Sequence, residues 1–224
     1  EFVDYRNNVI YNWGQNNVYA GEGGKYNIIS NYYKYGPSTR TNVRFRILNP
    51  FKTATIPFGQ FYVEGNYVDG SEDATRNNSM AVVMNNGTED DKARSLQSQA
   101  FASEQLMTET AEKAYNSVLE FAGASYRRDT LDQRIINDVK NRTGKIIDVQ
   151  GGFPHGTSYE ISKIAWPVLR STVQPMDTDK DGMPDEWEKK NGLDPVDAKD
   201  ASLTTLHTYY TNIEVYINSI LKKE

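Results

Sequence analysis

The segment Asn27-Ile28-Ile29-Ser30-Asn31 is a short apolar run that ends in asparagine, and similar runs return along the first part of the chain. Their closing residues are Asn12, Asn31, Asn49 and Asn66, which are 19, 18 and 17 residues apart. Short strands at such intervals, with Asn and Gly at the corners, are typical of the turns of a parallel β-solenoid. Asn tolerates the left-handed backbone that such corners need, and its side-chain amides can form hydrogen-bonded ladders between turns. An ordinary β-sandwich with Asn-rich turns also fits the pattern.

The composition excludes several classes of protein. The 224 residues are enough for one large domain, or for one domain with a small appendage. A net charge of −5 argues against a general nucleic-acid binder, which usually has a basic excess. No stretch approaches the roughly 18 apolar residues that a membrane span needs. The chain has no cysteine, which excludes disulfides, thiolate catalysis and Cys-based zinc sites.

Two stretches with helical spacing follow the strand-rich part. Apolar residues at i, i+3 and i+4 predict a helix over 111–122 that ends at Gly123, and a second helix over 129–143. These apolar faces are typical of helices that pack on a core rather than of ligand sites. We also expect short strands at 80–84 and 145–149.

The run Asp177–Glu188 fits the 12-residue loop of an EF-hand. Carboxylates stand at positions 1, 3, 5, 9 and 12, and Gly182 stands at position 6, where the chain turns sharply. Calcium is a hard cation that takes six to eight oxygen ligands, and this spacing wraps them around one centre. The alternative is a solvated acidic turn. The predicted Ca²⁺ ligands are Asp177, Asp179, Asp181, the backbone carbonyl of Met183, Asp185 and Glu188.

One departure from the EF-hand pattern bears on the role of this loop. Pro184 occupies position 8, where paired EF-hands use a backbone N–H to join two loops, and proline has none. The chain also lacks a second loop of this kind. The sequence therefore favours a solitary structural site over a cooperative calcium sensor.

Basic residues in the strand-rich part form a second candidate site. Arg44 and Arg46 alternate on a predicted strand, so their side chains are expected on one face. Together with Arg6 they could bind an acidic sugar polymer, because a guanidinium can grip a carboxylate with two hydrogen bonds. The alternative is surface charge paired with Asp or Glu. The full predicted groove comprises Arg6, Lys25, Lys34, Arg40, Arg44 and Arg46.

Several stretches resemble pectate lyases of the first polysaccharide-lyase family. The segment Asp4–Gly14 resembles the turn that follows the active site of that family, and Tyr26–Tyr33 and Phe61–Tyr67 resemble its next turns. Other segments resemble the helical region and the ending of the bacterial branch. They are Ala122–Asp129, Asp132–Arg134, Thr143–Asp148, Asp179–Glu188 and Tyr210–Glu214. The resemblance covers nearly the whole chain.

The resemblance implies a mainly β fold, in which the C-terminal turns of a right-handed parallel β-helix are joined to α-helices and a small EF-hand-like calcium loop. The family cleaves polygalacturonate by β-elimination, with Ca²⁺ bridging the substrate carboxylate and the protein. Its Arg-x-Pro-x-x-Arg pattern should lie just before Asn7-Asn8, which here falls before residue 1. We therefore assign no catalytic residue. We expect the C-terminal part of a lyase, with pectin or polygalacturonate and an N-terminal β-helix portion as partners, in a secreted, periplasmic or bacterial cell-surface location.

The predicted organisation has three parts. Residues 1–95 hold β-helix turns and a long loop, residues 96–173 a helical segment that packs on them, and residues 174–224 the calcium loop and a terminal helix. A non-catalytic, calcium-stabilised carbohydrate-binding or scaffold module is the alternative function. A calcium-sensing regulator is disfavoured by the single Pro-interrupted loop.

Overall fold

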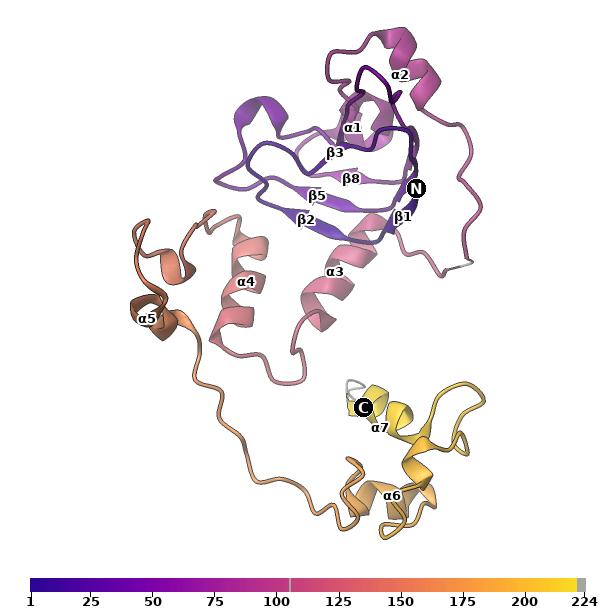
Figure 1. Cartoon of the computed structure of the whole chain (residues 1–224), viewed down its shortest axis with the longest axis vertical. Helices are drawn as coiled ribbons and strands as arrows, with labels where there is room; N and C mark the ends of the chain where they lie inside the picture. The colour runs from indigo at the N-terminus through magenta and orange to yellow at the C-terminus, as the bar shows by residue number, and fades with distance from the viewer. Residues whose placement is uncertain (105, 221–224) are drawn as a thin grey trace. The chain divides into compact units, whose positions relative to one another are not determined.

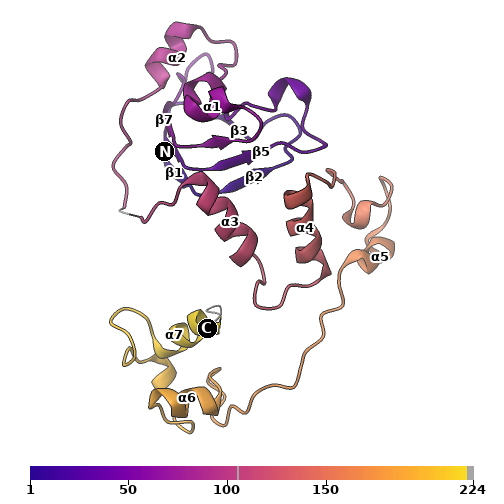
Figure 2. The same ribbon diagram turned by 180° about the vertical axis from the view of Figure 1, so that it is seen from behind.

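The computed structural model describes residues 1–104 and 106–220, and the chain divides into two compact units. The first unit comprises Glu1–Ala122 and Thr130–Trp166, and the second comprises Gly123–Asp129 and Pro167–Glu224. Within the described residues the strands belong to the first unit, while the acidic loop belongs to the second (Figures 1 and 2).

The strands of the first unit form three small sheets in which all described pairs are parallel. The first sheet contains β1 (Phe2–Arg6), β4 (Lys25–Ile29) and β7 (Gln60–Glu64), the second contains β2 (Val9–Tyr11), β5 (Tyr32–Lys34) and β8 (Tyr67–Val68), and the third contains β3 (Val18–Ala20) and β6 (Leu48–Pro50). Consecutive strands enter different sheets, so the chain coils and each turn stacks on the one before (Figures 1 and 2). The prediction of short parallel strands is confirmed.

The corner between the first and second sheets repeats in each turn. Asn7, Ser30 and Gly65 follow β1, β4 and β7 directly and have φ angles of 56°, 52° and 67°. A backbone in this left-handed region reverses the pleat and redirects the chain into the next sheet. Asn and Gly adopt it at least cost.

A ladder of asparagine side chains runs through the next position of each turn. Asn8 donates its backbone and side-chain N–H to the side-chain oxygen of Asn31, at 3.0 and 2.9 Å. Asn31 donates in the same way to Asn66, and Asn66 donates to Asn78. The amides, of which those of Asn31, Asn66 and Asn78 are buried, thereby satisfy one another across four levels of the coil.

The predicted spacing of the turns is wrong, although Asn31 and Asn66 do belong to the ladder. Asn12 instead accepts a hydrogen bond from the backbone of Ser38, and Asn49 lies in β6. Ladder neighbours are separated by 23, then 35 and then 12 residues. The apparent period of 17 to 19 residues arose because the four apolar runs include strands of different sheets, and the spacing between such strands is not the length of a turn.

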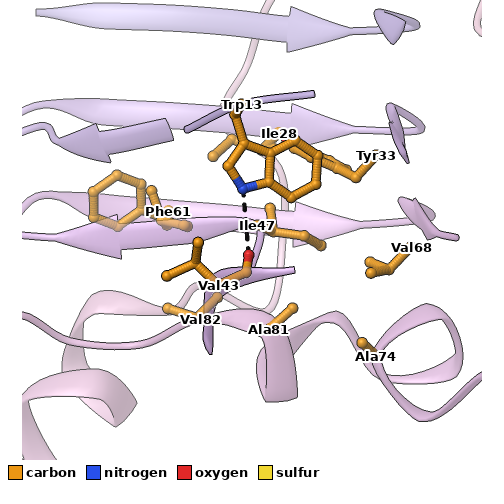
Figure 3. Close-up of a cluster of buried hydrophobic side chains, with 11 residues drawn as sticks. Trp13, Ile28, Tyr33, Val43, Ile47, Phe61, Val68, Ala74, Ala81 and Val82 are labelled. Carbon is orange, nitrogen blue, oxygen red and sulfur yellow. Dashed lines mark hydrogen bonds between the residues drawn. The ribbon is translucent and has the colours of Figure 1, made fainter. Parts of the chain in front are cut away.

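The core of the first unit lies inside the coil. It takes side chains from all three sheets, among them Ile28 of β4, Tyr33 of β5 and Leu48 of β6. Figure 3 shows the indole of Trp13 inside this cluster, where its N–H donates to the Val43 carbonyl at 3.3 Å. The helix α1 (Glu72–Arg76) and the 3₁₀ helix η2 (Asn78–Ala81) follow β8 and add two alanines to the cluster.

Further helices follow the coil. They are α2 (Glu89–Ser95), α3 (Ala111–Phe121), α4 (Thr130–Asn141) and α5 (Tyr159–Ser162). The bounds of α3 and α4 agree with the apolar spacing in the sequence. α3 packs on the second sheet, where the ring of Tyr115 stacks on Tyr32 at 4.3 Å and Tyr32 stacks on Tyr67 at 4.7 Å.

Two predicted strands are absent. In the segment 80–84 the chain is helical up to Ala81, and only Val82 forms an isolated bridge with Leu48. The segment 145–149 forms no strand. In the first segment the pairing is limited to hydrogen bonds such as that from the Val83 N–H to the Leu48 carbonyl at 3.0 Å, and in the second Ile146 and Ile147 are exposed. A short apolar run alone does not establish a strand.

The second unit contains α6 (Asp185–Asn191), the 3₁₀ helix η5 (Asp200–Ser202) and α7 (Asn212–Ile220). α6 ends at Gly192, whose φ of 75° forms a left-handed cap. The rings of Trp187 in α6 and Tyr216 in α7 meet edge to face at 5.1 Å. None of the described helices is both long and apolar enough to cross a membrane.

Candidate metal centre

The acidic loop of the second unit is braced by its own carboxylates. Asp177 accepts hydrogen bonds from the backbone N–H groups of Lys180 and Gly182, at 2.7 and 3.1 Å. Asp181 accepts one from Met183 at 2.7 Å. The left-handed φ of 100° at Gly182 gives the sharp turn that position 6 requires. The loop is therefore held in a curve that places several acidic side chains on its inner side.

Several carboxylate oxygens at this centre are buried and have no hydrogen-bond partner among the residues that the structure describes. They are Oδ2 of Asp179, Oδ2 of Asp181, both side-chain oxygens of Glu188 and Oδ1 of Asp200. Glu188 has 0% of its surface exposed and Asp200 has 8%. Buried charges of one sign without partners are strongly unfavourable, and a bound cation is the usual remedy.

The acidic groups form two overlapping sets. Ligand atoms of Asp177, Asp179 and Asp181 lie within 4.8 Å of one another. Ligand atoms of Asp181, Glu188 and Asp200 do the same. Because Asp181 belongs to both sets, the two sets surround one region. The donor set consists of oxygen alone, which fits a hard cation such as Ca²⁺ and does not fit a soft metal.

The electrostatics of the protein without an ion agree with this fit. Burial, together with the neighbouring carboxylates Asp181 and Asp179, raises the pKa of Glu188 to about 7. Burial also raises the pKa of Asp179 and of Asp181. Each of these shifts has the direction expected when negative charges are crowded together without a compensating cation.

The structure does not bring all six predicted ligands together. Asp185 turns to Thr178, from which it accepts a backbone and a hydroxyl hydrogen bond, each at 2.8 Å. These bonds lower the pKa of Asp185 and occupy both of its oxygens. Met183 is fully buried, and a role for its carbonyl stays a prediction.

Sequence reasoning missed Asp200. It lies 12 residues beyond the end of the loop, in η5, and no spacing rule of the EF-hand includes it. The segment before it is acidic, but that composition alone does not select one aspartate. Only the three-dimensional placement of the carboxylate beside Glu188 identifies it.

The predicted basic groove is not assembled on a strand. Arg44 and Arg46 follow a 3₁₀ helix over Thr41–Val43, so the expected alternation on one strand is wrong. The Arg44 guanidinium lies 4.9 Å from the centre of the Tyr35 ring, and Arg46 donates to the Gln15 carbonyl at 2.7 Å.

The third predicted sugar-binding residue is also engaged by the protein. Arg6 donates two hydrogen bonds to Asp4, both at 2.5 Å, and one to the hydroxyl of Thr108 at 2.8 Å. Lys34 is buried and donates to Tyr115 and to the carbonyl of Lys140. A substrate-binding role for Arg6, Arg44 and Arg46 stays a prediction, and binding a sugar carboxylate would require Arg6 to exchange partners.

Comparison with known proteins gives one consistent relationship. The chain is 32% identical over 226 aligned positions to "Probable pectate lyase C" of Aspergillus flavus. It is 31% identical to the protein of that name in Aspergillus oryzae and 33% identical to the one in Aspergillus terreus. Each alignment covers 97% of this chain. No protein-family model matches the chain.

These alignments show a pectate lyase-like relationship. They also limit what can be said of the length and the source of the related proteins. Each covers 48% of the relative, so the chain spans about half the length of the curated relatives it matches. The relatives are fungal, so the expected assignment to the bacterial branch and to a bacterial location is not supported.

Proposed function

We propose that this chain forms the C-terminal turns of a right-handed parallel β-helix in an extracellular polysaccharide lyase of the pectate lyase type. The observation that carries the proposal is identity of 31% to 33% with proteins named probable pectate lyase C along 97% of the chain. The coil of three parallel sheets, each gaining a strand per turn, fits such a helix.

The proposed substrate is an acidic polysaccharide of the polygalacturonate class, which is cleaved by β-elimination. In that reaction Ca²⁺ bound near the substrate carboxylate acidifies the neighbouring proton. The 224 residues contain no Arg-x-Pro-x-x-Arg pattern, so we assign the catalytic arginine to a part of the protein outside them. The role proposed for this chain is to supply turns of the coil that support that site.

We assign a separate, structural Ca²⁺ to the acidic loop. Asp177, Asp179, Asp181 and Glu188 hold it, and the Met183 carbonyl is a further predicted ligand. Asp185 acts through Thr178 and fixes the start of the loop instead of reaching the ion directly. This assignment rests on the buried oxygens without partners.

Electrophoresis of the pure chain through gels that contain polygalacturonate tests the substrate class. The expected result is slower migration than in gels that contain neutral dextran. The double variant Arg44→Gln/Arg46→Gln should lose part of this retardation, and Arg76→Gln/Arg94→Gln serves as an exposed control of equal charge change. Equal migration in both gels contradicts binding of an acidic polysaccharide.

A lyase assay on the same preparation tests the placement of catalysis. The unsaturated product of β-elimination absorbs in the ultraviolet, and the pure chain is expected to form none. Turnover by the pure chain would place the catalytic groups within these 224 residues. Polymer binding without turnover, in a longer form of the protein as well, would support the non-catalytic carbohydrate-binding module.

A further inference from the structure

We propose that Asp200 is a calcium ligand from outside the loop, so that one ion ties the loop Asp177–Glu188 to the segment that leads into α7. The inference rests on the structural Ca²⁺ site proposed above. It adds a ligand that the loop pattern does not contain and a mechanical role for the ion.

The position of the Asp200 carboxylate supports this assignment. One of its oxygens lies within 4.8 Å of ligand atoms of Asp181 and Glu188. Oδ2 accepts a hydrogen bond from the backbone N–H of Asp194 at 3.0 Å, while Oδ1 is buried and has no partner within residues 1–104 and 106–220. One oxygen thus fixes the side chain and the other is available to a cation.

The backbone around Asp200 holds the side chain in this position. Its N–H donates to the Asp197 carbonyl at 3.0 Å, and its carbonyl accepts from the N–H of Leu203 at 2.9 Å. The carboxylate is therefore presented by a folded turn and not by a free loop. A preorganised ligand of this kind loses little conformational entropy when an ion binds.

Burial of Glu188 gives the second, independent reason to place a cation here. Its side chain is fully buried, and in the described part of the chain neither of its oxygens has a hydrogen-bond donor. Asp200 brings a further acidic group to the same side chain. Without a cation this contact would be repulsive in a region shielded from water, so the fold would disfavour it.

The segment that follows Asp200 connects the ion to the terminal helix. The buried amide of Asn212, the first residue of α7, donates to the Asp200 carbonyl and to the Thr205 hydroxyl, each at 2.8 Å. α7 in turn packs on α6 through Tyr216 and Trp187. A ligand at Asp200 therefore links the loop, α6 and α7 around one centre.

The proposed ligand set also favours Ca²⁺ over Mg²⁺. Carboxylates from two separate segments, some able to bind through both oxygens, provide a large and irregular oxygen shell. Ca²⁺ accepts six to eight such ligands at variable geometry, whereas Mg²⁺ requires a near-ideal octahedron and retains its water.

Calorimetric titration of the chelator-treated chain with Ca²⁺ tests the role of Asp200. The variant Asp200→Asn is expected to bind Ca²⁺ roughly tenfold more weakly or worse, as loss of one charged ligand predicts. The matched control is Asp197→Asn, an exposed aspartate of the same segment, which should bind within about twofold of the wild type. Equal affinities of the two variants would overturn the inference.

Thermal unfolding with and without Ca²⁺ separates ligation from a merely structural role. Without the ion, Asp200→Asn should raise the unfolding temperature or leave it unchanged, since it removes repulsion; with the ion it should lower that temperature. A loss in both conditions would mean that Asp200 acts only through its hydrogen bonds, and would overturn the inference.

A third variant distinguishes failure of this inference from failure of the site itself. Glu188→Gln should abolish binding if the loop holds calcium at all. If the wild type also binds none, the calcium site is wrong. If the wild type binds, Glu188→Gln does not and Asp200→Asn binds normally, only the external ligand is wrong.

Discussion

The side-chain oxygen of Asn66 accepts two hydrogen bonds from Asn31, one from its backbone N–H at 2.9 Å and one from its side-chain amide at 3.0 Å. Asn31 repeats this arrangement as acceptor for Asn8. Its amide also donates to the Tyr5 carbonyl at 2.9 Å. One fully buried side chain therefore satisfies polar groups in three turns of the coil.

The variant Asn31→Ala should destabilise the first unit strongly. It removes the acceptor of the Asn8 backbone N–H and of one Asn8 side-chain N–H, and it removes the amide that donates to the Tyr5 carbonyl. Each such loss costs about 1 to 3 kcal/mol. We expect the free energy of unfolding to fall by roughly 3 kcal/mol or more in urea denaturation. The exposed Asn85→Ala is the control and should change it by less than about 0.5 kcal/mol. If the two variants lose similar amounts of unfolding free energy, the asparagine ladder does not contribute specially to stability.

Local patterns in the sequence predicted the local parts of this fold. The apolar spacing located α3 and α4, and the asparagine-closed runs indicated parallel strands with amide ladders. The spacing of turns failed because a coil fixes the register of strands within each sheet, while the connections between sheets vary in length. Ladder neighbours 23 and 35 residues apart show that variation.

At the metal centre, too, local sequence patterns were predictive and contacts between separate segments were not. The loop Asp177–Glu188 follows a rule of sequence spacing, because its predicted ligands come from one short curve of chain. Asp200 reaches the centre through the packing of a separate segment, and Asp185 is diverted by the nearby Thr178. The expected alternation of Arg44 and Arg46 on one strand is wrong, because a 3₁₀ helix over Thr41–Val43 and a turn stand where a strand was predicted.

The pair Asp4–Arg6 should make the first unit sensitive to acid. Hydrogen bonds from the Arg6 guanidinium lower the pKa of Asp4 to about 2, below its ordinary value of 3.8. A carboxyl group whose pKa is lower in the folded state stabilises the fold above its unfolded pKa, and this contribution is lost as pH falls through the folded pKa. The stabilisation should therefore be complete above about pH 5 and disappear toward about pH 2.

Urea denaturation of the wild type and of Asp4→Asn, at several pH values, measures this contribution. We expect the wild type to be more stable by about 1 kcal/mol at neutral pH, after allowance for solvent screening, with the difference vanishing near pH 2. In an Arg6→Gln background the pH-dependent difference should shrink, because the partner that lowers the pKa is absent. A difference that is independent of pH would argue against the ion pair.

If the proposed site holds calcium, its removal should loosen the second unit and leave the first unchanged. Without the ion, buried carboxylates such as Glu188 and Asp181 repel one another, so the loop and the helices that it joins should open more often. Hydrogen–deuterium exchange of the chelator-treated chain should be faster over 177–220 and unaltered in β4 and β7. Equal addition of Mg²⁺ should restore less protection than Ca²⁺. Unchanged exchange over 177–220 would show that the loop folds without a metal.

Lys34 and Arg142 both hold α4 against the coil, but they should contribute differently to the free energy of unfolding. Lys34 is buried and donates to two neutral acceptors, the Tyr115 hydroxyl and the Lys140 carbonyl, both at 3.1 Å. Arg142 follows α4 and has an anionic partner, Asp69 at 2.7 Å, together with the Tyr35 carbonyl at 2.8 Å and the face of the Tyr35 ring at 4.0 Å. At Arg142 the anionic partner offsets the cost of burying a charge. At Lys34, where both acceptors are neutral, that cost is less well offset.

We therefore expect Lys34→Met, which retains the apolar stem, to change the free energy of unfolding by less than about 1 kcal/mol. Arg142→Gln should cost about 2 kcal/mol, because it breaks the ion pair and leaves Asp69 partly buried without its cation. The left-handed φ of 57° at Arg142 is equally unfavourable for both of its residues, so backbone strain cancels in this comparison. Hydrogen–deuterium exchange across 130–141 provides the second readout, and should be accelerated only in Arg142→Gln. The opposite order of the two variants would mean that hydrogen bonds to neutral acceptors outweigh the partly buried ion pair in holding α4 against the coil.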